Sequence, residues 1–324
     1  MSLTWLITGS AGFIGSNLVV QLLKGGHKVI GIDNLSTGKQ VNVDRALEKA
    51  EGRYQFICGD ICVGDDIKKC FEQKINVVVH LAAQGSVQRS FDDAEYNNKL
   101  NVDGFLKVMQ ASGAKSVSRF IYASSCAVYG DTEVLPISES QCPAPLSPYA
   151  SSKLMNELLS RNLAHLYPDT SFIGLRFFNV FGPWQDPLGD YAAVIPRWID
   201  LCMDGRQPVV FGDGNATRDF CYVGNICDLV ERIAVQKILK TGIVYNVSSG
   251  VSTSLNELYN TVLSGLNEKG YPLSFKNPIY KPWREGDIEH SLGSIELVKK
   301  DLDFEPKVGL SEGVGEILKS QYGL

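Results

Sequence analysis

The sequence predicts an α/β protein built on a doubly wound parallel sheet, followed by a smaller α/β lobe. The main observation is a regular alternation of short apolar segments, typical of buried parallel strands, with helix-like segments. Such strand–helix units are joined by right-handed crossovers, and their ligand lies beyond the carboxyl ends of the strands. Six strands are expected, over residues 5–7, 28–33, 54–60, 77–83, 119–125 and 170–181.

The strongest local signal is a glycine-rich stretch after the first expected strand. Gly9, Gly12 and Gly15 stand three residues apart and lead into an apolar helix over 16–23. A strand, a glycine turn and a helix N-terminus form a phosphate site, because backbone N–H groups and the helix dipole face the anion. The second strand ends in Asp33, whose carboxylate would accept from an adenosine ribose and repel a 2′-phosphate. We therefore expect a Rossmann-type domain that binds NAD rather than NADP; the alternative is a strand–helix joint with glycines for packing alone.

The rest of the chain supplies the expected domain organisation. Residues 98–112 have the pattern of a helix, and the next helix has Ser147 as N-cap and Pro148 at its first position. After residue 181 the segments shorten and turns multiply. We expect an NAD-binding Rossmann domain over 1–179, with 222–248 packing back on it, and a second, discontinuous lobe over 180–324.

Composition excludes several classes of partner. The chain has 324 residues, a net charge of −5 and no basic block, so neither nucleic acid nor a membrane surface is expected as a partner. The eight cysteines form no C-x-x-C pair and the four histidines do not cluster beside them, which favours reduced thiols and no metal site. No apolar run has membrane-spanning length, and the first strand leaves no room for a signal peptide, so a cytoplasmic enzyme is expected.

A second chemical signal lies on the expected helix after residue 147. Tyr149 and Lys153 stand four residues apart, on one face of that helix, and Ser124-Ser125 ends the preceding strand. A tyrosine has a pKa of about 10, and one nearby cation lowers it by ~1–3 units, so Lys153 needs help from the positive nicotinamide of NAD⁺ to make Tyr149 a base. With Ser125 holding the reacting oxygen, this set suits alcohol-to-ketone oxidation with hydride transfer. The alternative is a surface tyrosine and lysine at chance spacing.

Along nearly its whole length the chain resembles the extended short-chain dehydrogenase/reductases, and within them the nucleotide-sugar 4-epimerases. The motifs in the first half are TGSAGFIG at 8–15, DNLSTG at 33–38, GDI at 59–61, HLAA at 80–83, SSCAVYG at 124–130 and SPYASSK at 147–153. Those in the second half are RFFNVFGP at 176–183, YAAVIPRW at 191–198, GDGNATRDFCYV at 212–223 and REGDIEHS at 284–291. The stretches 85–90, 185–196 and 284–291 are most similar to the bacterial UDP-N-acetylglucosamine 4-epimerases.

The resemblance implies an NAD-dependent isomerase that inverts C4 of a UDP-sugar through a 4-keto intermediate. It also implies that the discontinuous lobe over 180–324 binds the UDP-sugar. UDP-GlcNAc to UDP-GalNAc is the expected reaction, with UDP-Glc to UDP-Gal beside it. Tyr149 would be the base, Lys153 its activator and Ser125 the orienting hydroxyl. The implied cofactor contacts are Gly9, Gly12, Phe13, Ile14, Gly15, Asp33, Asn34, Ser36, Thr37, Gly38, Asp60, Ile61, Leu81, Ala82, Ala83, Asn101, Ser124, Tyr149 and Lys153. The implied substrate contacts are Ser86, Ser125, Tyr149, Asn179, Gln185, Ala193, Val194, Arg218, Arg284, Asp287 and Ser291.

Several alternatives stay open. Relatives that dehydrate or decarboxylate carry acids where this chain has Cys126 and Ala127, which cannot protonate a leaving oxygen, so those activities are less favoured. A UDP-hexuronic acid or UDP-N-acetylhexosaminuronic acid 4-epimerase would use the same residues, and a catalytically idle NAD-binding protein is a further alternative. Motif alignment alone separates Ser125 from Ser124.

The implied substrate residues also carry alternatives. Arg218 and Arg284 suit a pyrophosphate, because a guanidinium matches phosphate oxygens in pairs; alternatively they form ion pairs with neighbouring acids inside the lobe. Ser291 matches a position that borders the sugar's C2 substituent in the family, where a small residue leaves space for an N-acetyl group; alternatively it caps a turn. The family pairs helices near 98–112 and 148–166, so a homodimer is expected.

Overall fold

The computed structural model describes residues 2–188, 193–236, 241–271, 273–283 and 288–324. The chain divides into two compact units, which are treated separately below. Unit 1 comprises Met1–Gly130, Cys142–Phe177 and Cys227–Tyr245, and unit 2 comprises Asp131–Gln141, Phe178–Ile226 and Asn246–Leu324. Among the described residues, no helix is both long and apolar enough to cross a membrane.

Unit 1 is organised around a seven-stranded sheet with the order β11-β6-β5-β4-β1-β2-β3. Its strands are β1 (Thr4–Thr8), β2 (Lys28–Asp33), β3 (Tyr54–Cys58), β4 (Val77–His80), β5 (Arg119–Ser125), β6 (Ser171–Phe177) and β11 (Ile243–Val247). Trp5 of β1 lies beside Val29 on one side and Val77 on the other, in parallel register. β1 is therefore paired along both edges, and its residues Trp5, Leu6 and Ile7 are buried, as its apolar sequence requires. The predicted doubly wound parallel sheet is confirmed.

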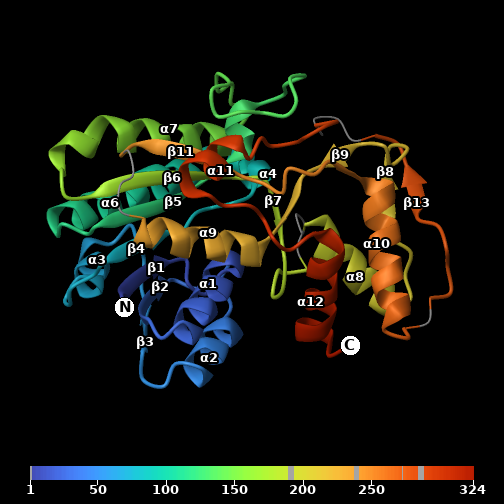
Figure 1. Cartoon of the computed structure of the whole chain (residues 1–324), viewed down its shortest axis with the longest axis horizontal. Helices are drawn as coiled ribbons and strands as arrows, with labels where there is room; N and C mark the ends of the chain where they lie inside the picture. Colours follow the sequence, from blue (N-terminus) through green and yellow to red (C-terminus); the bar gives the residue numbers. More distant parts are fainter. Residues whose placement is uncertain (1, 189–192, 237–240, 272, 284–287) are drawn as a thin grey trace. The chain divides into compact units, whose positions relative to one another are not determined.

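Helices lie on both faces of this sheet (Figure 1). α3 and α7 pack on α6, and α6 and α7 also contact strands β4 to β6, whereas α1 packs against α2 and β2. The helical segments of unit 1 are α1 (Phe13–Lys24), α2 (Gln40–Glu48), α3 (Gly64–Cys70), α4 (Val87–Asp92), α5 (Ala94–Asn98), η1 (Lys99–Gly104), α6 (Phe105–Ala114), η2 (Cys126–Tyr129), α7 (Pro148–Leu163) and η3 (Ala164–Leu166). α9 (Val223–Val235) begins in unit 2 and continues into unit 1.

Two predicted elements of the first half are divided differently in the structure, and the strands expected over 54–60 and 77–83 end earlier, at Cys58 and His80. The helix expected over 98–112 is a continuous run of three segments, α5, the π-helical η1 and α6, so one turn is wider than an α-helix. The strand expected over 170–181 is two strands, because β6 ends at Phe177 and Phe178 donates its backbone N–H to the carbonyl of Val247. Beyond that point β7 (Asn179–Phe181) pairs in parallel with β10 (Phe220–Tyr222) inside unit 2.

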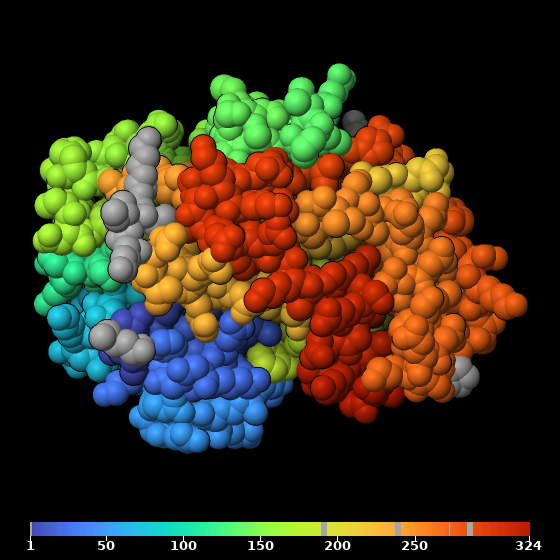
Figure 2. Space-filling view, in the orientation of Figure 1, coloured from blue at the N-terminus to red at the C-terminus, as the bar shows by residue number. Residues whose placement is uncertain are grey.

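Unit 2 has its own apolar core, surrounded by helices and three two-stranded pairings. Trp198 of α8, Tyr259 of α10 and Ile317 of α12 meet in this core. Figure 2 shows the outer surfaces of α10 (orange) and α12 (red) side by side, and the two helices are in contact. The remaining elements are α8 (Val194–Met203), β8 (Val209–Phe211), β9 (Thr217–Arg218), β12 (Thr253–Ser254), α10 (Leu255–Glu268), β13 (Ile279–Lys281), α11 (Glu296–Leu302) and α12 (Leu310–Tyr322).

Residues 131–141 lie with unit 2, whereas the sequence placed them in the first domain. Ile137 explains this difference, since its N–H donates to the carbonyl of Leu292 and its carbonyl accepts from the N–H of Ser294. Asn246 adds a bond from its side-chain amide to the same carbonyl at 2.9 Å. The segment is therefore held by residues more than a hundred positions away in the chain, which no local sequence pattern reveals.

Candidate functional site

The first crossover of unit 1 forms a backbone cradle that requires glycine at two positions. Gly9 has φ of +72°, and a Cβ there would stand 2.7 Å from the backbone nitrogen of Ala82. A Cβ on Gly15 would stand 2.1 Å from the carbonyl oxygen of Gly9. Gly12 is the N-cap of α1 and offers no capping side chain, so the first amides of that helix stay available to an anion. The cradle therefore fits a phosphate group held by backbone N–H donors.

Asp33 stands beside this cradle at the carboxyl end of β2. Its carboxylate accepts from the backbone N–H of Ala11 at 3.0 Å and from that of Leu35 at 2.8 Å. Burial raises the pKa of Asp33, and these two hydrogen bonds act in the opposite direction. A Cβ on Gly38 would lie 2.7 Å from a carboxylate oxygen of Asp33, so Gly38 lets the loop close over the acid. The carboxylate is thus fixed in place beside the glycine cradle.

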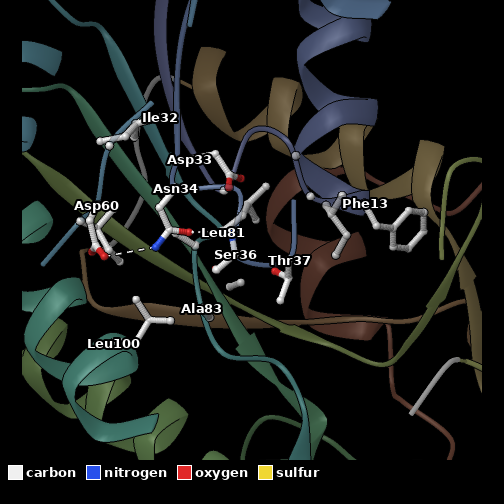
Figure 3. Close-up of a pocket in the computed structure, with 18 residues that line it drawn as sticks. Phe13, Ile32, Asp33, Asn34, Ser36, Thr37, Asp60, Leu81, Ala83 and Leu100 are labelled. Atoms are coloured by element: carbon white, nitrogen blue, oxygen red, sulfur yellow. Dashed lines mark hydrogen bonds between the residues drawn. The ribbon is translucent and has the colours of Figure 1, made fainter. Parts of the chain in front are cut away.

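A cavity of about 240 Å³ lies over this end of the sheet (Figure 3). Asn34 donates to Asp60 across it at 3.2 Å and accepts from the N–H of Ser36 at 3.0 Å. Predicted cofactor residues that line the cavity are Gly9, Gly12, Phe13, Ile14, Gly15, Asp33, Asn34, Ser36, Thr37, Asp60, Ile61, Leu81, Ala82 and Ala83. The structure therefore brings together residues from the ends of four strands.

Four lining residues were missed by the sequence analysis: Ile32, Gly59, Leu100 and Ala123. Ile32, Gly59 and Ala123 immediately precede Asp33, Asp60 and Ser124, polar residues at or near the carboxyl ends of their strands. The positions of the strand ends were therefore the signal that would have found them. The predicted cofactor residues outside the lining of this cavity are Gly38, Asn101, Ser124, Tyr149 and Lys153.

A buried histidine holds the floor of the cavity in place. The Thr8 hydroxyl accepts from the backbone N–H groups of Leu81 and Ala82, both at 3.2 Å, and lies 3.0 Å from Nδ1 of His80. Because both hydroxyl lone pairs are used, the Thr8 proton goes to His80, whose Nδ1 must then be an unprotonated acceptor. Burial, with a smaller effect from Lys153, lowers the pKa of His80 to about 3. A neutral His80 thus fixes the backbone that faces the glycine cradle.

The three predicted catalytic residues come together where β5 meets α7. Ser147 caps α7 by accepting from the N–H of Ala150, and Pro148 fills the first position, so the helix begins as predicted. Tyr149 is half-buried in its first turn, and Lys153, one turn later, is buried. The Lys153 ammonium donates to the carbonyl of Ala123 at 3.0 Å and lies 5.8 Å from the centre of the Tyr149 ring. Ser125 hydrogen-bonds to Tyr149.

Protein groups alone do not make Tyr149 a base. Burial raises its pKa to about 12, the hydrogen bond with Ser125 acts in the opposite direction, and Cys126 adds to the rise. Burial also lowers the pKa of Lys153 to about 8. Each nearby cation lowers the pKa of a tyrosine by ~1–3 units. A second positive charge beside Lys153, such as a nicotinamide cation, would therefore act in the direction that a base requires.

The two adjacent serines point to different partners. The Ser124 hydroxyl donates to the Glu157 carboxylate, which is buried on α7, whereas the Ser125 hydroxyl accepts from the N–H of Ala127 at 3.1 Å. Ser125 is the serine that interacts with Tyr149. This arrangement favours Ser125 as the serine beside Tyr149, while the Ser124 hydroxyl is bound to Glu157 and leaves its backbone for the predicted cofactor contact.

Asn101 belongs to a buried amide network rather than to the lining of the cavity. Its Oδ1 accepts from the N–H of Gln84 at 2.8 Å, and its Nδ2 donates to the Gln84 carbonyl at 3.0 Å and to the Ser152 hydroxyl at 3.1 Å. Ser86, a predicted substrate residue, caps α4 by accepting from the N–H of Arg89 and donates its own N–H to the Gln84 side chain. The network therefore ties the segment after β4 to the first turns of α7.

The other predicted substrate residues belong to unit 2. The side chains of Asn179 and Gln185 donate to the backbone carbonyls of Asp219 and Val180, at 3.3 and 3.2 Å. Ala193 is the N-cap of α8 and Val194 its first residue. Arg284 and Asp287 lie outside the described residues, so their predicted roles are not located.

Arg218 and Ser291 each follow one residue of the pair Thr217 and His290, which join two segments of unit 2. The Arg218 guanidinium donates to the carbonyls of Thr217 and Glu289, at 2.9 and 3.1 Å. Asp219, the acid next to Arg218 in the chain, accepts from Ser249, Gly250 and Gly293. Ser291 is 8% exposed, and its N–H donates to the carbonyl of Thr217 at 3.1 Å.

The observed sheet, the glycine cradle at its first crossover and the Ser125, Tyr149 and Lys153 set together define a short-chain dehydrogenase/reductase. Comparison with known proteins gives the family within this class. The NAD dependent epimerase/dehydratase family matches residues 5–248. The chain belongs to this family, and NAD is its cofactor, which the glycine cradle and Asp33 fit.

Three similar proteins illustrate the relationship. The UDP-glucose 4-epimerase of Mycolicibacterium smegmatis is 35% identical over 97% of each chain. The crystal structure of a UDP-N-acetylglucosamine 4-epimerase from Methanobrevibacter ruminantium, in complex with UDP-N-acetylmuramic acid, has a TM-score of 0.90 and 34% identity over 99% of each chain. That of the Thermus thermophilus UDP-glucose 4-epimerase complex with NAD has a TM-score of 0.85 and 31% identity over 99% of each chain.

Proposed function

We propose that this protein is an NAD-dependent UDP-sugar 4-epimerase, an isomerase, and that UDP-GlcNAc and UDP-GalNAc are its substrate pair, with UDP-glucose also accepted. The observation that carries the proposal is the meeting of Ser125, Tyr149 and Lys153 at the end of β5, beside a cradle that fits NAD. Full-length similarity to UDP-glucose and UDP-N-acetylglucosamine 4-epimerases supports the reaction class. An idle binding protein would have no need of this set.

The reaction assigns a step to each residue. Tyr149 takes the proton of the C4 hydroxyl, Ser125 holds that oxygen by a hydrogen bond, and Lys153 stabilises the phenolate by its charge. NAD⁺, when bound, would supply the acceptor and donor of the C4 hydride. The 4-keto sugar turns about its link to UDP and presents its other face. Hydride would then return to the opposite side of C4 while Tyr149 gives the proton back to the C4 oxygen, and C4 is inverted. Cys126 and Ala127 supply no acid for elimination, so the reaction ends at inversion.

The UDP portion is assigned to residues of unit 2. Arg218, together with Arg284, provides guanidinium groups for the two phosphates, and Asn179, Gln185, Ala193 and Val194 contact the nucleotide. Ser291 is small and nearly buried, and we assign it the position beside the sugar's C2 substituent. This small residue is the reason for preferring N-acetylated sugars over plain hexoses.

The test of the activity uses the purified holoenzyme with UDP-GlcNAc, UDP-glucose and UDP-N-acetylglucosaminuronic acid, and follows C4 inversion by NMR. Inversion of UDP-GlcNAc is expected to be the fastest of the three. Faster inversion of the uronic acid would replace the proposed substrate, and no inversion of any of them would overturn the reaction class. Tyr149→Phe should lower kcat by roughly 10²–10⁴ with NAD still bound. A variant with more than about a third of wild-type turnover would show that Tyr149 is not the base.

Ser291→Tyr tests the sugar pocket. The larger side chain should overfill the space for the N-acetyl group, and overpacking typically costs about 1–3 kcal/mol. That corresponds to a roughly 5- to 150-fold loss of kcat/KM for UDP-GlcNAc. UDP-glucose needs no such space and serves as the control within the same protein. An unchanged ratio of the two kcat/KM values would remove Ser291 from the pocket.

A further inference from the structure

Three residues on one face of α7 interact with three successive residues of β5. Tyr149, Lys153 and Glu157 are four residues apart, so they project from the same face of the helix. Lys153 donates to the carbonyl of Ala123, Glu157 accepts from the hydroxyl of Ser124, and Tyr149 interacts with Ser125. The reaction uses the first two helix residues but has no chemical step for Glu157, although it is 7% exposed and carries a charge.

Glu157 forms a two-bond ion pair with Arg176 of the neighbouring strand β6. Arg176 Nε lies 2.9 Å from Glu157 Oε1, and Arg176 Nη2 lies 2.7 Å from Oε2. Arg176 is directly opposite Ser124 in the parallel register of β5 and β6. Both members of the pair are buried. Together with Ser124, they join α7, β5 and β6 in one fixed arrangement.

The same guanidinium also holds the turn that follows Ser125. Its Cζ lies 4.6 Å from the centre of the Tyr129 ring, and Tyr129, at the end of η2, is 1% exposed. A buried ion pair is a weak source of stability, because removing two charges from water offsets most of their attraction. Its bidentate geometry, in contrast, is highly directional. These contacts are directional and involve Ser124 before Ser125 and Tyr129 after it. They suit a role in holding Ser125 in position rather than in stabilising the fold.

We infer that Glu157, Arg176 and Ser124 are positioning residues, which set the height and rotation of α7 on β5 and thereby the distances among Ser125, Tyr149 and Lys153. None of the three touches the substrate in this assignment. The inference rests on the proposed function of Tyr149. Small displacements matter there, since misplacing reacting groups by about 1 Å can lower a rate by ~10²-fold.

Ser124→Ala and Ser160→Ala form a matched pair to test this inference. Both serines are buried and join α7 to β5, but Ser160 donates to the hydroxyl of Tyr122, two residues before Ser124 and farther from Tyr149. We expect Ser124→Ala to lower kcat about tenfold and to shift the acid limb of the kcat–pH profile to higher pH. KM and bound NAD should stay within twofold of wild type. Ser160→Ala should lower kcat less than twofold. Equal loss of kcat in the two variants would overturn the inference.

A charge-free double variant separates position from stability. Glu157→Leu together with Arg176→Met removes both charges, so neither is left unpaired, and such replacements often keep or increase stability. We expect a melting temperature near that of wild type with kcat at least 30-fold lower. A kcat of the double variant within threefold of the wild-type value would contradict the inference. If the double variant does not fold, the serine pair decides the question.

The two proposals fail in different ways. If wild-type protein inverts no UDP-sugar, or if Tyr149→Phe stays active, the proposed function is wrong. If the wild type and Tyr149→Phe behave as expected while the two serine variants are equally active, only the positioning role is wrong.

Discussion

Replacing the glycines of the cofactor cradle by alanine should produce effects that follow the space available at each position. A Cβ at Gly15 would stand 2.1 Å from the Gly9 carbonyl oxygen, whereas a Cβ at Gly12 would stand 3.3 Å from the same atom. At Gly315, inside α12, a Cβ has no heavy atom within 4 Å among the described residues. We expect Gly15→Ala to damage the fold and the cofactor site, Gly12→Ala to affect mainly the cofactor, and Gly315→Ala to affect neither.

The magnitude follows from two opposing contributions. Alanine stabilises a helix interior by up to about 1 kcal/mol relative to glycine, which is the full expected effect of Gly315→Ala. At Gly15 the Gly9 turn must move by roughly 1 Å to reach normal contact, and overpacking of this kind costs about 1–3 kcal/mol. The net loss for Gly15→Ala is then about 0–2 kcal/mol, or a fall in Tm of up to roughly 3 °C for a chain of 324 residues. The Gly12 Cβ needs a shift of only a few tenths of an ångström, but it would stand where the pyrophosphate approaches.

The assay measures the Tm of each variant and the amount of NAD(H) released per protein chain. The expected order of retained NAD is Gly315→Ala equal to wild type, then Gly12→Ala, then Gly15→Ala. If Gly15→Ala keeps both its Tm and its full NAD content, the close approach of α1 to the turn is wrong. If Gly315→Ala loses NAD, the differences do not report on the cradle.

Three further changes address cofactor choice, acid stability and assembly. Asp33→Asn should raise the preference for NADP over NAD at least tenfold, because it removes the charge that repels a 2′-phosphate; NADP in the wild-type nucleotide pool would contradict this. The pKa of His80 is about 3 in the folded chain and 6.5 in the unfolded chain. Between these pH values only the unfolded chain binds a proton at His80. The free energy of unfolding therefore falls by ~1.4 kcal/mol for each pH unit below 6.5. His80→Asn, which keeps an acceptor for Thr8, should flatten the urea-unfolding pH profile by about 2 kcal/mol between pH 6.5 and 4.5; equal slopes would refute the assignment. Tyr96 and Met155 are exposed apolar residues on helices that the family pairs. Met155→Glu should therefore convert the expected dimer to a monomer, as measured by light scattering. A monomeric wild type would refute the expected dimer.

The parts of the molecule that depend on local pattern were predictable from the sequence. The strand end at Asp33, the glycine turn and the start of α7 depend on residues close in the chain, and the structure has them where they were expected. The third strand ends at Cys58, two residues before the expected Asp60. The edge strand β11 was not predicted. Its Asn246 is fully buried, and it is satisfied by Glu139 and by the carbonyl of Ile137, more than a hundred residues away. A buried polar residue argues against a strand until such distant partners are known.

The candidate site shows the same division. Tyr149 and Lys153 could be found from their spacing, but the choice between Ser124 and Ser125 depends on strand register. Ser124 faces Glu157 because Arg176 lies beside it on β6, and this pairing joins residues 52 positions apart. The π-helical turn at Lys99–Gly104 was likewise invisible, because the amide network of Asn101 that accompanies it reaches Gln84 and Ser152.

The path of the chain between the two units has a consequence for biosynthesis. The chain passes from one unit to the other at residues 130/131, 141/142, 177/178, 226/227 and 245/246. The sheet of unit 1 receives its last strand, β11, only when residues 243–247 have been made. A nascent chain that has just completed β6 therefore carries an unpaired strand edge on the ribosome, while most of unit 2 is still to be translated. The cofactor-binding half does not mature as an independent first domain, and a cut after Phe177 would produce a fragment prone to edge-to-edge association.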